Sequence, residues 1–302
     1  MAAIVPPGQL VYGIQLPIQA QSNYFVEPWE LAAPPADMAA VAQAADRSGF
    51  FYVAVCDHIV IPRDKAAGMS TVWYDTIATL SWIAAQTTQT RLLSSVYNLT
   101  YRHPLVGAKA FATLDHLSNG RAIIGVGAGH VEDEFTALGV DYHRRGALLD
   151  EGIDVLDRAL RDEYVDELGL APQPVQKPRP PIWIGGSAPA AVRRVAKRAD
   201  GWIPQGTPRE GMPPLIELLR SERGDEPCDI GAITAWLHVG EPSWDMRRDV
   251  TSGSAAEIAD DLREWGKLGV NHLQVRFPSR SASELVEQIE TFGAEVGPLL
   301  SA

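Results

Sequence analysis

Residues 91–130, RLLSSVYNLTYRHPLVGAKAFATLDHLSNGRAIIGVGAGH, have the pattern of a strand, a helix and a second strand. The run 91–97 is short, apolar and contains a β-branched residue, which is typical of a buried strand. Pro104 opens a helical pattern, because proline lacks an amide that the first turn would leave unpaired. The Asn-Gly pair at 119–120 ends it, since both residues tolerate the left-handed conformation. With the apolar run 122–126, the stretch predicts a βαβ unit.

The same alternation continues through the rest of the chain. Strands are predicted at 11–16, 50–55, 91–97, 122–126, 182–184, 201–203, 231–239 and 270–277. Helices are predicted at 35–48, 74–86, 104–118, 144–160, 188–198, 210–223, 255–267 and 281–296. Strands that alternate with helices form a parallel sheet covered by helices. Eight repeats in 302 residues favour an α/β fold of one domain, 1–302, closed as a (β/α)8 TIM barrel with insertion loops. A doubly wound open sheet is the alternative.

Composition excludes several classes of protein. The net charge of −12 argues against nucleic acid as a partner, because nucleic-acid binding needs clustered Lys and Arg. No apolar run approaches the roughly 20 residues that span a bilayer, so no membrane partner is expected. The N-terminus lacks a basic region and a cleavage pattern. Cys56 and Cys228 stand alone, which predicts reduced core thiols in a cytoplasmic protein.

The candidate chemistry lies at the ends of the predicted strands, where barrels of this kind carry their active sites. These ends hold Asp57-His58, Ser94 to Asn98, Gly127 to His130, Gly185 to Ser187, and Arg276. His58 is the sharpest candidate, because a histidine with a pKa of about 6.5 can give or take a proton at neutral pH. The alternative is a structural pair in which His58 only bonds a neighbouring carbonyl. No second cluster at ligand spacing accompanies it, so no metal is expected.

Two groups of glycines also suggest binding. Gly185-Gly186-Ser187 joins a strand to a helix N-terminus, where backbone amides and the helix dipole favour a phosphate. A tight turn that needs positive φ is the alternative. The glycines in 125–129 favour close approach of a flat ring to the barrel mouth rather than a dinucleotide fingerprint. The acidic residues 132–134 are expected to form a solvated first helical turn, not to act as catalytic acids.

Longer blocks carry a resemblance to a known family. They are the Asp-His pair after the second strand, WYDTIATLSWIAAQTTQTRL at 73–92, YRHPLVGAKAFATLDHLSNGRAIIGVGAG at 101–129, and PIWIGGSAPAAVRRVAKRADGWIP at 181–204. Together they resemble the bacterial luciferase-like flavin monooxygenase superfamily, and most closely its branch of oxidoreductases dependent on the deazaflavin coenzyme F420. The similarity extends from Val11 to the last helix.

The resemblance implies a TIM barrel, often a homodimer, that binds a reduced flavin or deazaflavin in its mouth. It implies that His58 is the proton donor or acceptor beside the deazaflavin C5, and that Asp57 helps to hold the ring. It also implies that the end of the third strand carries a bulge with a non-prolyl cis peptide, placed at Ser95-Val96, against the back face of the ring. The other implied cofactor contacts are Asn98, Ala128, Gly129 and His130 around the ring or its side chain, and Gly185 and Gly186 at the phosphate.

The chain also departs from the family pattern. His130 stands where relatives that oxidise a sugar phosphate carry an acidic residue, and Pro62 stands where they carry a tryptophan. Both departures argue against that substrate. The connector at 163–181 holds five prolines and is expected to run over the surface without regular structure.

The leading hypothesis is a cytoplasmic oxidoreductase that moves a hydride between F420 and a small organic substrate. His58 would handle the proton, and Arg276 could pair with an anionic group on cofactor or substrate. One alternative is a monooxygenase that uses reduced FMN supplied by a partner reductase. The other is a non-catalytic relative that only binds a flavin.

Overall fold

Eight parallel strands close into a barrel in the computed structural model, which describes residues 3–246 and 248–300. In ring order the strands are β1 (Val11–Gln15), β2 (Tyr52–Val55), β3 (Arg91–Ser94), β5 (Ala122–Gly127), β8 (Ile182–Gly185), β9 (Gly201–Ile203), β10 (Asp229–Val239) and β12 (His272–Arg276). Closure comes from β12, which pairs in parallel with β1 and places His272 opposite Val11. The predicted closed barrel is confirmed.

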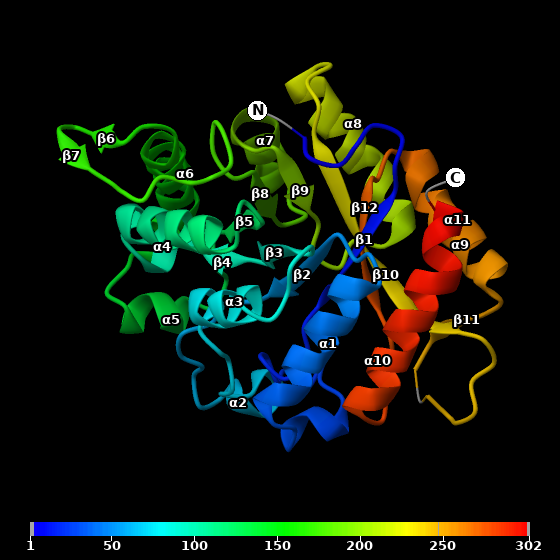
Figure 1. The fold of residues 1–302 in the computed structure, drawn as a ribbon. Helices are drawn as coiled ribbons and strands as arrows, with labels where there is room; N and C mark the ends of the chain where they lie inside the picture. Colours follow the sequence, from blue (N-terminus) through cyan, green and yellow to red (C-terminus); the bar gives the residue numbers. More distant parts are fainter. Residues whose placement is uncertain (1–2, 247, 301–302) are drawn as a thin grey trace.

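Helices cover the outside of the barrel (Figure 1). They are α1 (Pro35–Arg47), α3 (Thr76–Ala84), α4 (Pro104–Leu117), α6 (Arg145–Arg161), α7 (Pro189–Arg198), α8 (Met212–Arg223), α9 (Ala255–Leu268) and α10 (Ala282–Thr291). Their ends follow local chemistry. Proline opens the first turn of α1, α4 and α7. Ser254 and Glu257 form a reciprocal cap at the start of α9.

Short elements in the connections extend the predicted pattern. Near one end of the barrel in Figure 1 lie α2 (Ala66–Met69), α5 (Glu132–Ala137) and β11 (Val250–Gly253). The connector that was expected to be irregular contains a small hairpin, β6 (Tyr164–Val165) and β7 (Leu168–Gly169). Single 3-10 turns occupy Pro28–Leu31, Leu99–Tyr101, Tyr142–Arg144 and Arg209–Gly211. In the predicted last helix, 281–296, α10 ends at Thr291 and a π turn occupies Phe292–Val296; α11 (Gly297–Leu300) then extends beyond the predicted end.

The strand predicted at 91–97 is divided into two. β3 ends at Ser94, and β4 (Tyr97–Asn98) resumes pairing with β5. The Ser94 side chain explains the gap, because its hydroxyl donates to the Gly125 carbonyl at 2.8 Å and accepts from the Gly125 amide at 3.0 Å. A side chain thereby replaces the backbone pairing at this point of the ladder. The peptide bond between Ser95 and Val96 is cis, as predicted.

Large side chains fill the interior of the barrel below its mouth. Tyr52, Leu93, Ile123, Trp183 and Ile203 form one buried cluster there. Two glycines make room for it: a Cβ at position 13 would lie 2.4 Å from the Tyr52 ring, and one at 201 would lie 2.4 Å from Trp183. The interior of the barrel is therefore a packed core rather than a pore.

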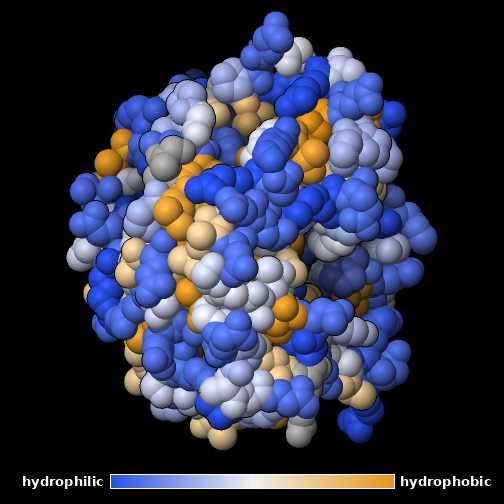
Figure 2. Space-filling view, turned by 90° about the vertical axis from the view of Figure 1, so that its right-hand side faces the viewer, coloured by the Kyte–Doolittle hydropathy of each residue, from blue (hydrophilic) through white to orange (hydrophobic). Residues whose placement is uncertain are grey.

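The outer surface shown in Figure 2 is mainly hydrophilic, with hydrophobic residues in scattered groups. This view faces the side on which α9, α10 and α11 lie in Figure 1. Within 3–246 and 248–300, no helix has the length and apolar character needed to cross a membrane.

Candidate active site at the barrel mouth

A cavity of about 810 Å³ opens at the carboxyl ends of the barrel strands. Its volume lies in the range of about 300–1,000 Å³ that is usual for cofactor and substrate sites. The proposed site residues all line it: Asp57, His58, Ser95, Val96, Asn98, Ala128, Gly129, His130, Gly185, Gly186 and Arg276. Side chains from strands far apart in the sequence therefore meet in one space.

Val96 forms part of the floor of this cavity, between two glycines. A Cβ at Gly127 would lie 2.5 Å from the Val96 Cγ2, and one at Gly185 would lie 2.6 Å from its Cγ1. Gly129 has a φ of 74°, and a Cβ there would crowd the Tyr101 hydroxyl at 2.9 Å. The floor thus consists of one branched side chain flanked by glycine backbone. A flat ring system can approach such a surface closely. The residues present thus fit a flavin or deazaflavin.

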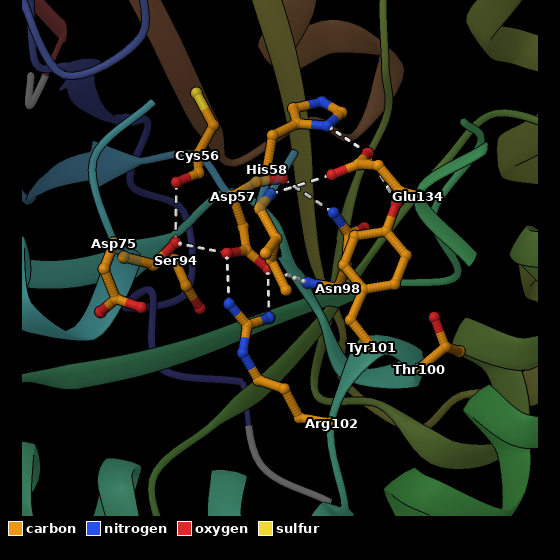
Figure 3. Close-up of polar contacts among 12 residues, drawn as sticks. Cys56, Asp57, His58, Asp75, Ser94, Asn98, Thr100, Tyr101, Arg102 and Glu134 are labelled. Carbon is orange, nitrogen blue, oxygen red and sulfur yellow. Dashed lines mark hydrogen bonds and ion pairs between the residues drawn. The ribbon is translucent and has the colours of Figure 1, made fainter. Parts of the chain in front are cut away.

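His58 is held at the mouth by a buried carboxylate. Its Nδ1 lies 2.6 Å from Oε2 of Glu134, whose side chain is fully buried (Figure 3). The Tyr101 hydroxyl donates to the same oxygen at 3.0 Å, and the amides of Ile59 and Val60 donate to Oε1 at 2.9 and 3.3 Å. Since Nδ1 is occupied by Glu134, Nε2 is the nitrogen through which His58 can exchange a proton.

Glu134 carries its charge in this setting. Burial alone would raise the pKa of the carboxyl, but the hydrogen bond and charge of His58, the Ile59 amide and the Tyr101 hydroxyl outweigh it and lower that pKa. The expectation that all of 132–134 form a solvated turn is therefore wrong for Glu134. Residues 132 and 133 are exposed, as expected.

The missed carboxylate does have a signal in the sequence. Val131, Glu134, Phe135 and Leu138 recur at helical spacings of three and four, and the first three are buried. That stripe places position 134 on the inner face of α5, whereas its two acidic neighbours point outward. Because the three acidic residues are adjacent, they look equivalent until the helical period is applied to them.

Asp57 is engaged by protein groups on all sides. Arg102 forms two hydrogen bonds to its carboxylate, at 2.7 and 2.8 Å, and the Asn98 amide donates to it at 2.8 Å. The Thr76 hydroxyl lies 3.2 Å from the other oxygen, and the Asn98 side chain donates to the Asp57 carbonyl at 2.8 Å. These bonds tie the end of β2 to β4 and to the start of α3, and they fix the backbone from which His58 projects.

Two further rings surround His58. The Trp73 ring lies 4.4 Å from the His58 ring, and the His130 ring lies 5.5 Å from it, both edge to face. Burial, followed by the charge of His58, lowers the pKa of His130. Both effects favour the neutral form of the His130 ring.

The part of the cavity near the end of β8 suits an anion. Gly186 has a φ of 122° and precedes α7, but its amide donates to the Ile203 carbonyl at 3.0 Å. Ser187 bonds to the loop after β9, accepting from Gln205 at 2.9 Å. Two arginines line the cavity here: Arg194 pairs with Asp150 at 2.6 Å, whereas Arg145 lies 4.0 Å over the Tyr142 ring and donates to the Tyr142 carbonyl. Sequence reasoning did not single out Arg145.

Arg276 lies at the end of β12, between two aromatic rings. Its guanidinium is 5.2 Å from the centre of the Phe25 ring and 5.8 Å from that of Trp236. Burial and the charge of Arg248 lower its pKa. Cys56, expected in the core, instead lines the cavity, and burial raises the pKa of its thiol to about 11. Cys56 is thus a protonated wall residue.

Known proteins resemble this chain in sequence and in fold. A family model described as luciferase-like monooxygenase matches residues 12–260. An uncharacterised protein of Mycobacterium tuberculosis is 30% identical over 280 residues, which cover 85% of this chain and 93% of that protein. An F420-dependent glucose-6-phosphate dehydrogenase of Kineococcus radiotolerans is 32% identical over 203 residues, 61% of this chain and 56% of that protein. The oxygenating constituent of 3,6-diketocamphane monooxygenase of Pseudomonas putida, in complex with FMN, has a TM-score of 0.74 at 12% identity and covers 96% of this chain and 98% of its own.

Proposed function

The chain belongs to the luciferase-like monooxygenase family, and on this premise we propose that it transfers a hydride between coenzyme F420 and a small organic substrate. His58 is the proton donor or acceptor in this proposal. The observation that carries it is the buried pair of His58 and Glu134 beside the Val96 floor. The preference for F420 over FMN is supported by the resemblance of the central blocks and by the Kineococcus relative.

When bound, the deazaflavin supplies or accepts a hydride at one ring carbon, and it does not normally pass single electrons to oxygen. Val96, with the bare backbone of Gly127 and Gly185, would support the ring. Arg145, which lines the same cavity, would pair with the anionic part of the cofactor.

The protein supplies the proton that accompanies the hydride. In the direction of substrate reduction, the substrate gains two electrons with the hydride, and His58 Nε2 gives a proton to the atom that becomes negative. Oxidation reverses both transfers. Glu134 keeps Nδ1 protonated and offsets the positive charge of the imidazolium, so the ring orientation is the same in both directions. Solvent restores the proton on His58.

Binding of the two cofactors tests the first half of the proposal. Reduced F420 and reduced FMN would each be titrated into the purified protein without oxygen and followed by fluorescence. Tight binding of F420 and weak binding of FMN is expected. Submicromolar affinity for FMN with none for F420 would overturn the proposal and leave a monooxygenase fed by a partner reductase.

Substitution of His58 tests the second half. Oxidation of reduced F420 would be screened against enones, imines and quinones with the wild type, His58→Ala and the surface control His116→Ala. Loss of about 100- to 10,000-fold in turnover is expected for His58→Ala alone, the usual contribution of a positioned acid or base. If turnover survives in His58→Ala, the acid–base role is wrong. A protein that binds F420 but turns over none of the panel would be a binding protein rather than an enzyme for these substrates.

A further inference from the structure

Arg276 is a cation without a counter-charge at the edge of the cavity. Its side chain packs between Phe25 and Trp236, and among the residues that the structure describes no carboxylate pairs with it. A guanidinium stays charged at any physiological pH, so this charge cannot be removed by losing a proton. Keeping a partly buried charge unpaired is costly, and such a group is usually matched by an ion from elsewhere.

The acidic residues nearby are committed to other partners. Glu27 pairs with Arg248 at 3.0 Å. Glu30 accepts from the amides of Ile18 at 2.6 Å and Glu27 at 2.9 Å, which hold the turn at 28–31 in place. Arg248 itself lies 4.1 Å over the Trp236 ring. Of the two guanidiniums around this ring, Arg248 is neutralised by Glu27, and Arg276 alone is left to bind an anion.

The position of Arg276 separates it from the anionic end of the cofactor. β12 is two strands from β2, which carries His58, and three strands from β8, which carries Gly185. The cations nearer β8 are Arg145 of α6 and Arg194 of α7, and Arg194 is paired with Asp150. Next to Arg276 lies a side pocket of about 70 Å³ that shares Phe25 and Arg276 with the cavity. Leu16, Trp236 and Phe277 line it together with Glu27 and Glu30, the two carboxylates that are committed to other partners. An anion at Arg276 therefore belongs to a second molecule, whose body can contact the Phe25 and Trp236 rings.

We propose that the substrate is an organic monocarboxylate whose carboxylate pairs with Arg276 while its reacting carbon lies toward His58. This rests on the proposed function for the reaction, but not for the binding. The planar guanidinium donates two parallel hydrogen bonds to a carboxylate. A phosphate monoester carries nearly two charges and would need a second free cation here. The rings of Phe25, Trp236 and Trp73 suit an apolar or aromatic body.

Binding of matched probes tests the proposal without any turnover. Cinnamate, its methyl ester and phenyl phosphate share an aromatic body and differ in charge. Each would be titrated by calorimetry into wild type, Arg276→Lys, Arg276→Met and the control Arg280→Met, with and without reduced F420. Arg280 is exposed and pairs with Glu284, outside the cavity lining. Cinnamate is expected to bind the wild type best, and Arg276→Met to weaken it by about 10- to 100-fold, the loss of a charge-assisted hydrogen bond.

The remaining outcomes each decide the question. Methyl cinnamate should bind Arg276→Met and wild type with equal affinity, which also shows that the variant is folded. The affinity of Arg276→Lys for cinnamate should lie between those of wild type and Arg276→Met. Equal affinity of the wild type for acid and ester, tighter binding of phenyl phosphate, or no binding of cinnamate at millimolar concentration would overturn the proposal. A matching loss of F420 affinity in Arg276→Met would also overturn it and assign Arg276 to the cofactor. F420 turnover is not an arm of this test, so the proposed hydride transfer can fail independently.

Discussion

The hydrogen bond between His58 and Glu134 makes the proton chemistry of one residue depend on the charge of another. The carboxylate is buried, accepts four hydrogen bonds and carries its charge because these donors offset the cost of burial. In this arrangement Glu134 is a positioning residue: it fixes which nitrogen of His58 faces the cavity, and it does not itself line the cavity.

Substitution of Glu134 by Gln should therefore slow turnover without weakening cofactor binding. Gln keeps one acceptor for Nδ1 but removes the negative charge, and kcat is expected to fall by about 100-fold, near the lower limit for an acid–base group. Steady-state kinetics with reduced F420 and a fluorescence titration measure the two effects. Glu132→Gln, on the same helix but exposed, is the matched control and should behave as wild type. Equal loss in both variants would contradict the assignment.

The same substitution predicts a change in acid stability. The pKa of Glu134 is lower in the folded protein than its unfolded value of about 4.3, so its contribution is fully present above that value. The contribution is lost as the pH falls through the folded pKa. Wild type should be more stable than Glu134→Gln by about 1–3 kcal/mol at pH 7. Urea unfolding at a series of pH values should show this gap closing below about pH 4, and a gap that stays constant would count against a charged Glu134.

The floor of the cavity is built by elements rather than by any one side chain. β4, β5 and β8 meet at Val96, and the missing Cβ atoms of Gly127 and Gly185 allow that meeting. Val96 lies in the gap between β3 and β4. The two hydrogen bonds between Ser94 and Gly125 fix the alignment of β3 with β5 at this gap.

Gly127→Ala should disrupt this floor, because the new Cβ would lie 2.5 Å from a methyl group of Val96. We expect a loss of about 1–3 kcal/mol in the free energy of unfolding, typical of overpacking, and weaker cofactor binding. Gly68→Ala is the control, since its Cβ would meet only ordinary contacts at 3.9 Å. The double variant Gly127→Ala, Val96→Ala removes the clash and should recover most of the stability. If it does not, the contact with Val96 is not the reason for the glycine.

The whole molecule is a packed barrel with a cavity of about 810 Å³ at its mouth, so a ligand that fills this cavity should stabilise the fold globally. Reduced F420 at about 100 times its dissociation constant should add about 2.7 kcal/mol and raise Tm by roughly 4 °C. A thermal melt monitored by circular dichroism measures this. FMN at the same concentration is expected to leave Tm nearly unchanged, and the reverse order would contradict the choice of cofactor.

The architecture was predictable because its signals are local and repeated. Each signal indicates one kind of element: an apolar run of four to six residues indicates a strand, and a proline indicates a helix start. The Asn-Gly pair after α4 indicates a helix end, and both of its residues have positive φ. The division of β3 from β4 was missed by residue patterns because it depends on a bond between Ser94 and a residue 31 positions away. The pairing of Glu134 with His58 joins residues 76 apart, and Arg145 faces the cavity only through the packing of α6. Contacts of that range leave no periodic trace.

The amides of Ile59 and Val60 bond to the carboxylate that also holds His58, so the start of the loop from 59 to 72 and α5 are physically coupled. Exchanging that loop alone, in order to broaden the substrate range, would change the positions of these two amides relative to Glu134. Glu134 would then no longer hold His58 in its present orientation. Exchanging 58–73 together with 130–138 keeps Trp73, His58 and Glu134 in contact with the partners they have here. Diversification of this mouth is therefore constrained to paired changes in two segments.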